Sequence, residues 1–244
     1  MAQHVFLSPH LDDAVLSCGG LIYQLTTKGE TVLILTLMAG DPPDVLPNTP
    51  LVNELHARWE AGENPVSIRR EEDVDAANIL NAQVSHFNIP DCIYRTANGN
   101  PLYKQGKDLF STIHPADTAL QALKRVVLPK DAMIYAPLGI GNHVDHQIVL
   151  EWALTLPAIR FYEDYPYSEK SQVLLDTIGK FPKTIISDTI PVETEAFEAK
   201  CLAIAQYRSQ ISTFWSSNDE MKQNVRHHML KTGEGILAER YWTS

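Results

Sequence analysis

Residues 4–20 read "HVFLSPHLDDAVLSCGG", an apolar run that leads into a histidine and two adjacent aspartates before it turns apolar again. Residues 4–8 predict a short buried strand, and residues 12–28 follow with apolar side chains at helical spacing. Residues 31–38, "TVLILTLM", form a second apolar run that is long enough only for a strand. Strand, helix and strand in so short a stretch make a βαβ unit, which predicts a parallel sheet.

The remainder of the chain continues this alternation. We expect helices over residues 67–81 (with Ser67 as N-cap), 115–127, 143–156, 192–211 and 216–232, and strands over residues 84–89, 131–138, 158–164 and 183–189. Residues 39–66 are rich in proline and predict a long excursion with a short helix near 52–61, which suits a lid or a substrate wall. Because no linker rich in Gly, Ser or Pro divides the chain, we expect one α/β domain over residues 1–244.

The composition limits the classes of partner. The formal charge of −10 and the pI near 5.3 argue against nucleic acid or an anionic membrane surface. Cys18, Cys92 and Cys201 are widely spaced and odd in number, which favours reduced thiols in a cytoplasm over a disulfide framework. No basic leader with an apolar core precedes the first strand, and no stretch approaches about 18 apolar residues. We therefore expect a cytoplasmic chain without a signal peptide or a membrane span.

A second polar cluster repeats the arrangement of the first. Residues 136–149, "APLGIGNHVDHQIV", also follow an apolar strand and also open a helix. Because ligands bind beyond the carboxyl ends of parallel strands, we expect the two clusters to meet at one edge of the sheet. Two histidines and one carboxylate, with positions left open for water, form an accepted catalytic zinc shell, and His10, Asp13 and His146 provide this set. The cation would also balance the two adjacent acids, whose burial is otherwise costly.

The residues beside this set suggest a hydrolytic reaction. Zinc lowers the pKa of a bound water and polarises a carbonyl group. Asp12 is placed to take the proton of this water, and His143 is placed to stabilise an oxyanion or to protonate a leaving amine. Taken singly, each residue has an ordinary interpretation, since acids are frequent in the first turn of a helix and histidines in loops. The coincidence of two clusters, each at a turn from strand to helix, favours the metal site.

Both clusters resemble the signatures of the PIG-L/LmbE-like superfamily of zinc-dependent de-N-acetylases. The first signature is typically His-Pro-Asp-Asp-Glu, here residues 10–14 (HLDDA) before the Cys-Gly-Gly of residues 18–20, and the second is His-x-Asp-His, here residues 143–146. The resemblance implies a Rossmann-like (LmbE-like) α/β fold with helices flanking the sheet. It also implies that the zinc ligands are His10, Asp13 and His146 and that the general base is Asp12. By the same resemblance His143 stabilises the oxyanion or acts as the acid, and Asp145 orients a neighbouring histidine.

The resemblance extends over most of residues 4–211. In "IRREEDVDAANIL" it implies that Arg69 faces the pocket with Glu72 as its partner, although a surface charge paired with Glu72 is an equal alternative. In "FNIPDCIYR" it implies that Asp91 faces a sugar hydroxyl of the substrate. The late helix that ends near Ser209 and Gln210 also resembles that of the family.

Two departures from the family pattern concern the first signature. Leu11 replaces the usual proline, and Ala14 replaces the usual glutamate. Because carboxylates behind metal ligands orient them, the loss of this one predicts lower activity rather than loss of the metal.

Two further groups of aromatic and histidine residues have open interpretations. In residues 160–168, Tyr162, Tyr165 and Tyr167 either wall a sugar pocket or pack on the domain as an ordinary loop. The adjacent His227 and His228 do not share a helix face, so we expect both on the surface.

The expected function is hydrolysis of an N-acetyl group from an amino-sugar-containing small molecule, with Zn²⁺ as cofactor and release of acetate and a free amine. The resemblance is compatible with a homo-oligomer. One alternative is a metal-binding protein without catalysis, which Ala14 and residues 39–66 suggest. Another is a non-haem iron oxygenase, which uses the same two-histidine, one-carboxylate triad. A nucleotide-binding protein is disfavoured because the first turn lacks a G-x-G-x-x-G run.

Overall fold

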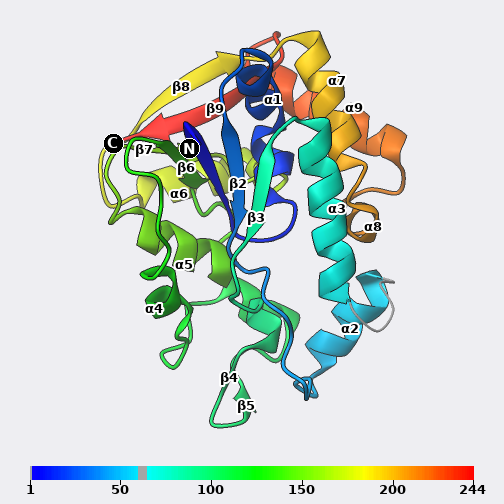
Figure 1. Cartoon of the computed structure of the whole chain (residues 1–244), viewed down its shortest axis with the longest axis vertical. Coiled ribbons are helices and arrows are strands. Elements are labelled where there is room, and N and C mark those ends of the chain that lie inside the picture. Colours follow the sequence, from blue (N-terminus) through cyan, green and yellow to red (C-terminus); the bar gives the residue numbers. More distant parts are fainter. Residues whose placement is uncertain (1, 60–64) are drawn as a thin grey trace.

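The computed structural model describes residues 2–59 and 65–244. Within these residues the centre is a seven-stranded sheet in the order β3-β2-β1-β6-β7-β9-β8 (Figure 1). The strands are β1 (His4–Ser8), β2 (Val32–Thr36), β3 (Gln83–His86), β6 (Met133–Pro137), β7 (Ile159–Tyr162), β8 (Ile186–Pro191) and β9 (Ala238–Thr243). The strands from β3 across to β7 pair in parallel, whereas β9 is antiparallel to both β7 and β8. The expected mostly parallel α/β fold is confirmed.

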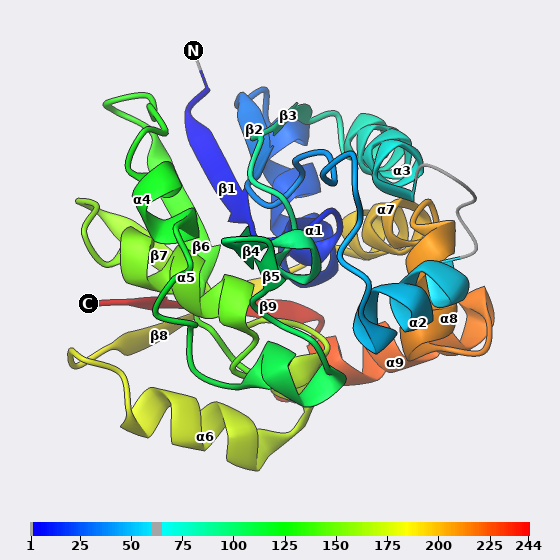
Figure 2. The ribbon, with the colours of Figure 1, turned by 90° about the horizontal axis from the view of Figure 1, so that it is seen from below.

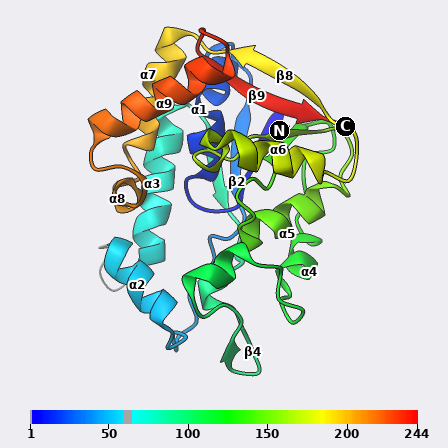
Figure 3. The same cartoon turned by 180° about the vertical axis from the view of Figure 1, so that it is seen from behind.

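Alternate residues of strand β1 belong to two different apolar cores, because successive side chains point to opposite faces of a sheet. Val5 and Leu7 belong to one apolar cluster, and Phe6 belongs to the other. The helices whose apolar residues join the Phe6 cluster are α1 (Asp13–Thr27), α3 (Pro65–Ile79), α7 (Thr194–Ile204) and α9 (Asn218–Thr232). Those of the opposite cluster are α4 (Ala119–Leu123), α5 (Val144–Ala153) and α6 (Ser171–Gly179), as the front and back views show (Figures 1 and 3).

The remaining elements lie mostly beyond the carboxyl ends of the parallel strands. They are α2 (Pro50–Trp59), α8 (Arg208–Phe214), the short hairpin β4 (Thr96–Ala97) and β5 (Asn100–Pro101), and the 3₁₀ turns η1 (Cys92–Tyr94), η2 (Gly106–Phe110) and η3 (Tyr167–Glu169). The helix expected near 52–61 is α2, and residues 60–64 of the excursion lie outside the described residues. Among residues 2–59 and 65–244, no helix combines the length and apolar character that crossing a bilayer requires.

Several expected helix boundaries are wrong. α3 begins at Pro65, a residue type favoured in the first turn, so Ser67 lies inside the helix instead of capping it. The helix expected over 192–211 is broken at Tyr207, whose backbone (φ −76°, ψ 60°) is not helical, and it continues as α8. The helix expected over 115–127 is reduced to Ala119–Leu123.

Candidate metal and catalytic site

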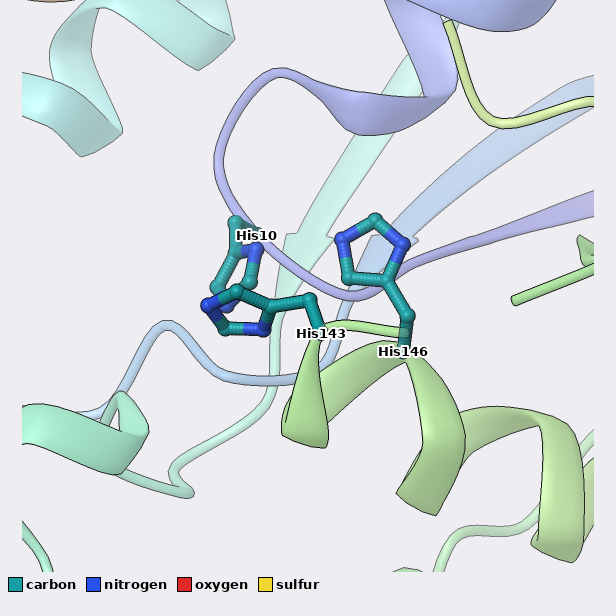
Figure 4. Close-up of side chains that lie close together, drawn as sticks. All are labelled: His10, His143 and His146. Atoms are coloured by element: carbon teal, nitrogen blue, oxygen red, sulfur yellow. The ribbon is translucent and has the colours of Figure 1, made fainter. Parts of the chain in front are cut away.

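The two polar clusters of the sequence meet at the carboxyl edge of the sheet, because β1 and β6 are parallel neighbours. His10 lies in the turn between β1 and α1, whereas His143 caps α5 and His146 lies in its first turn. The three imidazoles face one another across the gap between these turns (Figure 4). Each offers a ring nitrogen within 4.8 Å of those of the other two, which is close enough for a shared metal ion.

Asp13, the first residue of α1, completes the predicted ligand set. Its Oδ2 lies 3.1 Å from Nδ1 of His10 and 3.3 Å from Nε2 of His146. Donor atoms about 2.1 Å from a tetrahedral zinc ion lie about 3.4 Å from one another, so the two separations that involve Asp13 match those of such a site. The backbone N–H of His10 also donates to this carboxylate (2.7 Å), which fixes its orientation.

Among donor atoms that all lie within 4.8 Å of one another, His10 and His146 are grouped with His143 and not with Asp13. We favour Asp13 because its carboxylate contacts both other ligands and carries the negative charge that a cation needs. Nδ1 of His143 accepts a hydrogen bond from the backbone N–H of Asp145 (3.3 Å), as an N-cap does. Its Nε2 must then carry the proton of the neutral ring, which makes that atom a hydrogen-bond donor.

A carboxylate stands behind each of the two predicted histidine ligands. Asp145 Oδ2 lies 3.0 Å from Nε2 of His10, and Asp164 Oδ1 lies 2.6 Å from Nδ1 of His146. Such partners fix the tautomer, so that the nitrogen facing Asp13 keeps its lone pair for a metal. The orienting contact expected of Asp145 is therefore present, whereas Asp164 was not predicted. The only signal for Asp164 was its place at the end of the strand expected over residues 158–164.

Asp145 is itself held by buried partners. It accepts the backbone N–H of Cys92 (3.1 Å) and pairs with the guanidinium of Arg95. Arg95 also donates through Nε to Asp117 (3.0 Å) and is only 8% exposed. Arg95 was missed in the sequence because it lies 50 residues before its partner, outside either signature.

The charges around the cluster favour a cation at its centre. Burial alone would lower the pKa of His10 and of His146, but facing carboxylates, above all Asp13, raise the first well above its usual value and the second to about 10. Burial opposes ionisation of Asp13, yet His146 and His10 hold its pKa well below the usual range. These protons mark where positive charge is stabilised, and a divalent metal ion would replace them on binding.

The two residues assigned to proton transfer differ in their environment from the ligands. Burial, followed by the nearby charge of Asp13, raises the pKa of Asp12 to about 7. Burial, followed by the charge of His10, lowers the pKa of His143 well below its usual value. A neutral imidazole and a carboxyl group that holds protons more readily than usual thus stand beside the cluster.

The site opens into a cavity of about 510 Å³. The predicted residues that line it are His10, Asp12, Asp13, Arg69, Asp91 and His143, whereas Asp145 and His146 lie behind it. Nη2 of Arg69 lies 3.9 Å from Oδ2 of Asp12, and Oδ2 of Asp91 lies 3.9 Å from Nε2 of His10. A carboxylate and a guanidinium therefore reach the cavity beside the cluster, as recognition of hydroxyl groups requires.

The surface alternative for Arg69 is wrong, because this side chain is 6% exposed and its guanidinium lies 4.7 Å above the ring of Trp59. Its expected partner Glu72 instead accepts hydrogen bonds from the backbone N–H (2.9 Å) and the hydroxyl (2.6 Å) of Ser209. With its amide oriented to accept hydrogen bonds, Gln210 places its side-chain oxygen 3.2 Å from Nε of Arg69 and 3.2 Å from Nε1 of Trp59.

The structure also locates the tyrosines near 160–168, His228 and Ala14. Of the three tyrosines near 160–168, only Tyr167 lines the cavity, while the hydroxyls of Tyr162 and Tyr165 bond to Leu7 and Glu169. His228 is half-buried against the ring of Tyr165 at 4.8 Å, contrary to the expected surface position. Ala14 is buried in the core, and its N–H donates to Ser8 Oγ (3.0 Å).

Fold and cluster together define a Rossmann-like α/β protein with a candidate metal centre at the carboxyl edge of its sheet. The chain belongs to the PIG-L family, described as GlcNAc-PI de-N-acetylase, whose model matches residues 5–156. This confirms the resemblance seen in the signatures.

Individual relatives match nearly the whole chain. A 2'-N-acetylparomamine deacetylase of Niallia circulans is 27% identical over 98% of this chain and 89% of its own length. A deacetylase of the teicoplanin biosynthesis pathway, solved in complex with teicoplanin, is 25% identical with a TM-score of 0.80, and covers 98% of this chain and 96% of its own. The deacetylase Dbv21, which acts on the A40926 pseudoaglycone, is 25% identical with a TM-score of 0.76 over 99% and 96%.

Proposed function

We propose that residues 1–244 form one deacetylase domain that uses zinc to hydrolyse the N-acetyl group of an amino-sugar-containing small molecule, releasing acetate and a free amine. The observation that carries this proposal is the convergence of His10, Asp13 and His146 beside two further ionisable side chains, Asp12 and His143, in one cavity. Membership of the PIG-L family supports it, as do relatives named deacetylases that act on 2'-N-acetylparomamine and on the A40926 pseudoaglycone.

The residues divide the work of amide hydrolysis. His10, Asp13 and His146 would hold the zinc ion, which when bound would supply a water of lowered pKa and polarise the amide carbonyl. Asp12 takes the proton from the attacking water, and the nearby guanidinium of Arg69 stabilises the carboxylate of Asp12 before that transfer. Nε2–H of His143 donates a hydrogen bond to the carbonyl oxygen as negative charge develops there, and the proton that Asp12 has taken from the water passes to the leaving amine. Arg69 and Asp91 bind hydroxyl groups of the sugar.

The test is acetate release from N-acetylglucosamine, its glycosides and 2'-N-acetylparomamine, before and after chelation and after restoration of zinc. We expect activity to disappear with the chelator and return with zinc. Asp12→Asn should retain stoichiometric zinc and lose activity by a factor of about 10²–10⁴. Asp188→Asn is the matched control, because Asp188 is an exposed acid remote from the cavity.

Two outcomes would contradict the proposal. Unchanged hydrolysis in Asp12→Asn would remove the assigned base. Stoichiometric zinc without acetate release from the whole panel would favour the metal-binding alternative, and dioxygen consumption with a 2-oxo acid would favour the iron oxygenase.

A further inference from the structure

Much of the wall of the catalytic cavity is apolar. The charged and imidazole groups gather where the two signatures meet, but other segments supply the rest of the lining. Its main apolar members are Leu51, Leu55, Trp59, Phe110, Tyr167 and Phe214. A sugar presents hydroxyl groups, and such a surface offers them few hydrogen-bond partners.

One part of this wall is built by two helices that are distant in sequence. α2 and α8 pack against each other and lie side by side in the view from below (Figure 2). Trp59, the last residue of α2, is held in place, since the guanidinium of Arg69 in α3 lies 4.7 Å above its ring and the side-chain oxygen of Gln210 in α8 is 3.2 Å from its Nε1. Leu55 and Phe214 remain half-buried and line the cavity. This part of the wall is therefore preformed and not fully covered.

A second part comes from the 3₁₀ turn η2. Phe110 is 46% exposed although it lines the cavity. Its ring lies edge-on to His143 at 5.6 Å between centroids and to Tyr167 at 6.3 Å. Tyr167 can approach because residue 141 is glycine, where a Cβ would come within 2.7 Å of the tyrosine ring. A large apolar side chain thus stays open to solvent next to His143, the residue assigned to stabilise the oxyanion.

The size of the cavity exceeds the needs of one N-acetylated sugar ring. Its volume of about 510 Å³ lies within the range of pockets that enclose drug-sized ligands. An N-acetylated monosaccharide packed as densely as a protein interior fills roughly half of that space. The remaining space is bounded by the apolar wall.

We infer that the substrate carries, attached to its N-acetylated amino sugar, an apolar group about the size of a second ring, and that Leu55, Phe110 and Phe214 contact this group. The inference rests on the proposed function and narrows its substrate class. An apolar group can enter either as the aglycone of a glycoside or as a longer acyl chain on the same amide, and both would cover the same surface. Each buried methylene is worth about a fourfold gain in binding, so even partial coverage is measurable.

The first experiment compares kcat/KM of the zinc-loaded protein for N-acetylglucosamine, its phenyl and octyl glycosides, and N-octanoylglucosamine, with free amine as the readout. We expect at least one apolar substrate to exceed N-acetylglucosamine by about tenfold or more. Leu55→Asn and Phe110→Ser should each bring that ratio toward one. Leu202→Asn is the matched control, because Leu202 is 59% exposed on α7 and outside the cavity, and it should leave the ratio unchanged.

The second experiment measures binding of the amine products glucosamine and phenyl glucosaminide by calorimetry, which does not require turnover. Tighter binding of the phenyl compound that is lost in Phe110→Ser supports the inference even if no acetylated compound is hydrolysed, a result that would count against the proposed function alone. A gain for the glycosides alone identifies an aglycone, and a gain for N-octanoylglucosamine alone identifies an acyl chain. Equal kcat/KM for all substrates, with equal affinity for both products, overturns the inference and leaves the proposed function standing.

Discussion

His143 and His146 lie three positions apart at the start of α5, yet their surroundings differ. His146 has a carboxylate at each ring nitrogen, with Asp164 at 2.6 Å and Asp13 at 3.3 Å. His143 accepts the backbone N–H of Asp145 at Nδ1, and its ring lies near the rings of His10, His146 and Phe110, with no carboxylate hydrogen-bonded to it among the described residues. The first environment suits a metal ligand that is held rigidly, and the second suits a group that donates from Nε2 into the cavity.

The variant His143→Asn tests this division. Asparagine keeps a capping acceptor for α5 but removes the imidazole, so we expect retained zinc and a fall in kcat of about 10²–10⁴. His146→Asn is the paired variant, which should lose zinc. Elemental analysis together with kcat measures both. Loss of stoichiometric zinc in His143→Asn would instead make His143 a ligand in place of Asp13.

Arg95 supports a second prediction at this scale. Its removal leaves Asp117 and Asp145 buried without their cation, which costs about 3–5 kcal/mol of unfolding free energy. Because Asp145 orients His10, we also expect Arg95→Ala to weaken zinc binding about 10–100-fold. Urea denaturation and competition with a chelator measure the two effects.

The control for Arg95→Ala is Arg160→Ala. The ion pair of Arg160 with Asp188 is half-exposed, so its loss should lower the unfolding free energy by less than about 1 kcal/mol. Arg95→Lys should recover part of the loss, because lysine restores the charge but not the forked geometry. Unchanged zinc affinity in a folded Arg95→Ala protein would refute the orienting role.

His228 makes stability depend on pH. Burial, then the charges of Lys200, Lys231 and Arg240, lowers its pKa to about 3, so the folded ring stays neutral while the unfolded one titrates near pH 6.5. The unfolded state therefore binds the extra proton as the pH falls below about 6.5, and the folded protein loses up to about 2 kcal/mol by pH 5.

Unfolding free energies between pH 7 and pH 5 measure the contribution of His228. We expect the unfolding free energy of His228→Gln to fall less steeply between pH 7 and pH 5 than that of the parent protein. His227→Gln, one position away on an exposed site, should follow the parent curve. If the parent and His228→Gln have the same slope, the buried ring does not govern the dependence.

The sequence could predict that the two signatures meet, because their six candidate residues occupy two short turns whose place at the sheet edge follows from the βαβ pattern. It could not predict Arg95, Asp164 or Phe110. Each comes from a separate segment and meets the cluster only through the fold. The spacing of residues along the chain does not predict contacts between such distant segments.

At the scale of elements, α1 is approached closely by both α7 and β9. Glu239 of β9 accepts the backbone N–H groups of Gly20 and Leu21, each at 2.9 Å, and pairs with buried Lys200 of α7 at 2.7 Å. The glycines make this approach feasible: a Cβ at Gly19 would lie 2.9 Å from Lys200 Cγ. The Cys-Gly-Gly after the first signature is thus a packing feature.

Gly20→Ala tests this packing. Alanine favours a helix over glycine by about 1 kcal/mol, but its Cβ would lie 2.8 Å from Val192 and 2.9 Å from Glu239. We expect the crowding to prevail and to lower the unfolding free energy by about 1–3 kcal/mol. Gly179→Ala is the control, since nothing lies within 4 Å of its Cβ, and it should be neutral or stabilising. A stabilised Gly20→Ala protein would show that Val192 and Glu239 can move aside.

The elements that sequence reasoning found and missed differ in how local their determinants are. The first strand, helix and strand follow from apolar periodicity alone, and β1, α1 and β2 lie within two residues of their expected bounds. β9, which inserts between β7 and β8, was not expected, because its six residues become a strand only between partners from other parts of the chain. The break between α7 and α8 likewise depends on a tertiary contact, since Tyr207 donates its hydroxyl to Asp73 (2.6 Å).

At the scale of the whole molecule, the candidate zinc site joins the two halves of the parallel sheet. His10 and Asp13 come from the turn after β1, and His146 comes from the turn after β6, more than a hundred residues later. The unfolded chain does not hold these side chains together, so a metal that binds them must stabilise the fold.

Zinc should therefore raise the unfolding free energy by about 2.7 kcal/mol at a free concentration one hundred times its dissociation constant. We expect chelation to lower the midpoint of thermal unfolding and zinc to restore it, whereas magnesium, which prefers octahedral oxygen ligands, should not. Asp13→Ala should abolish the response to zinc, and Asp188→Asn, at an exposed site, should preserve it. A midpoint that ignores both chelator and zinc would mean that the two turns meet without sharing a metal, and the hydrolytic mechanism would lose its source of activated water.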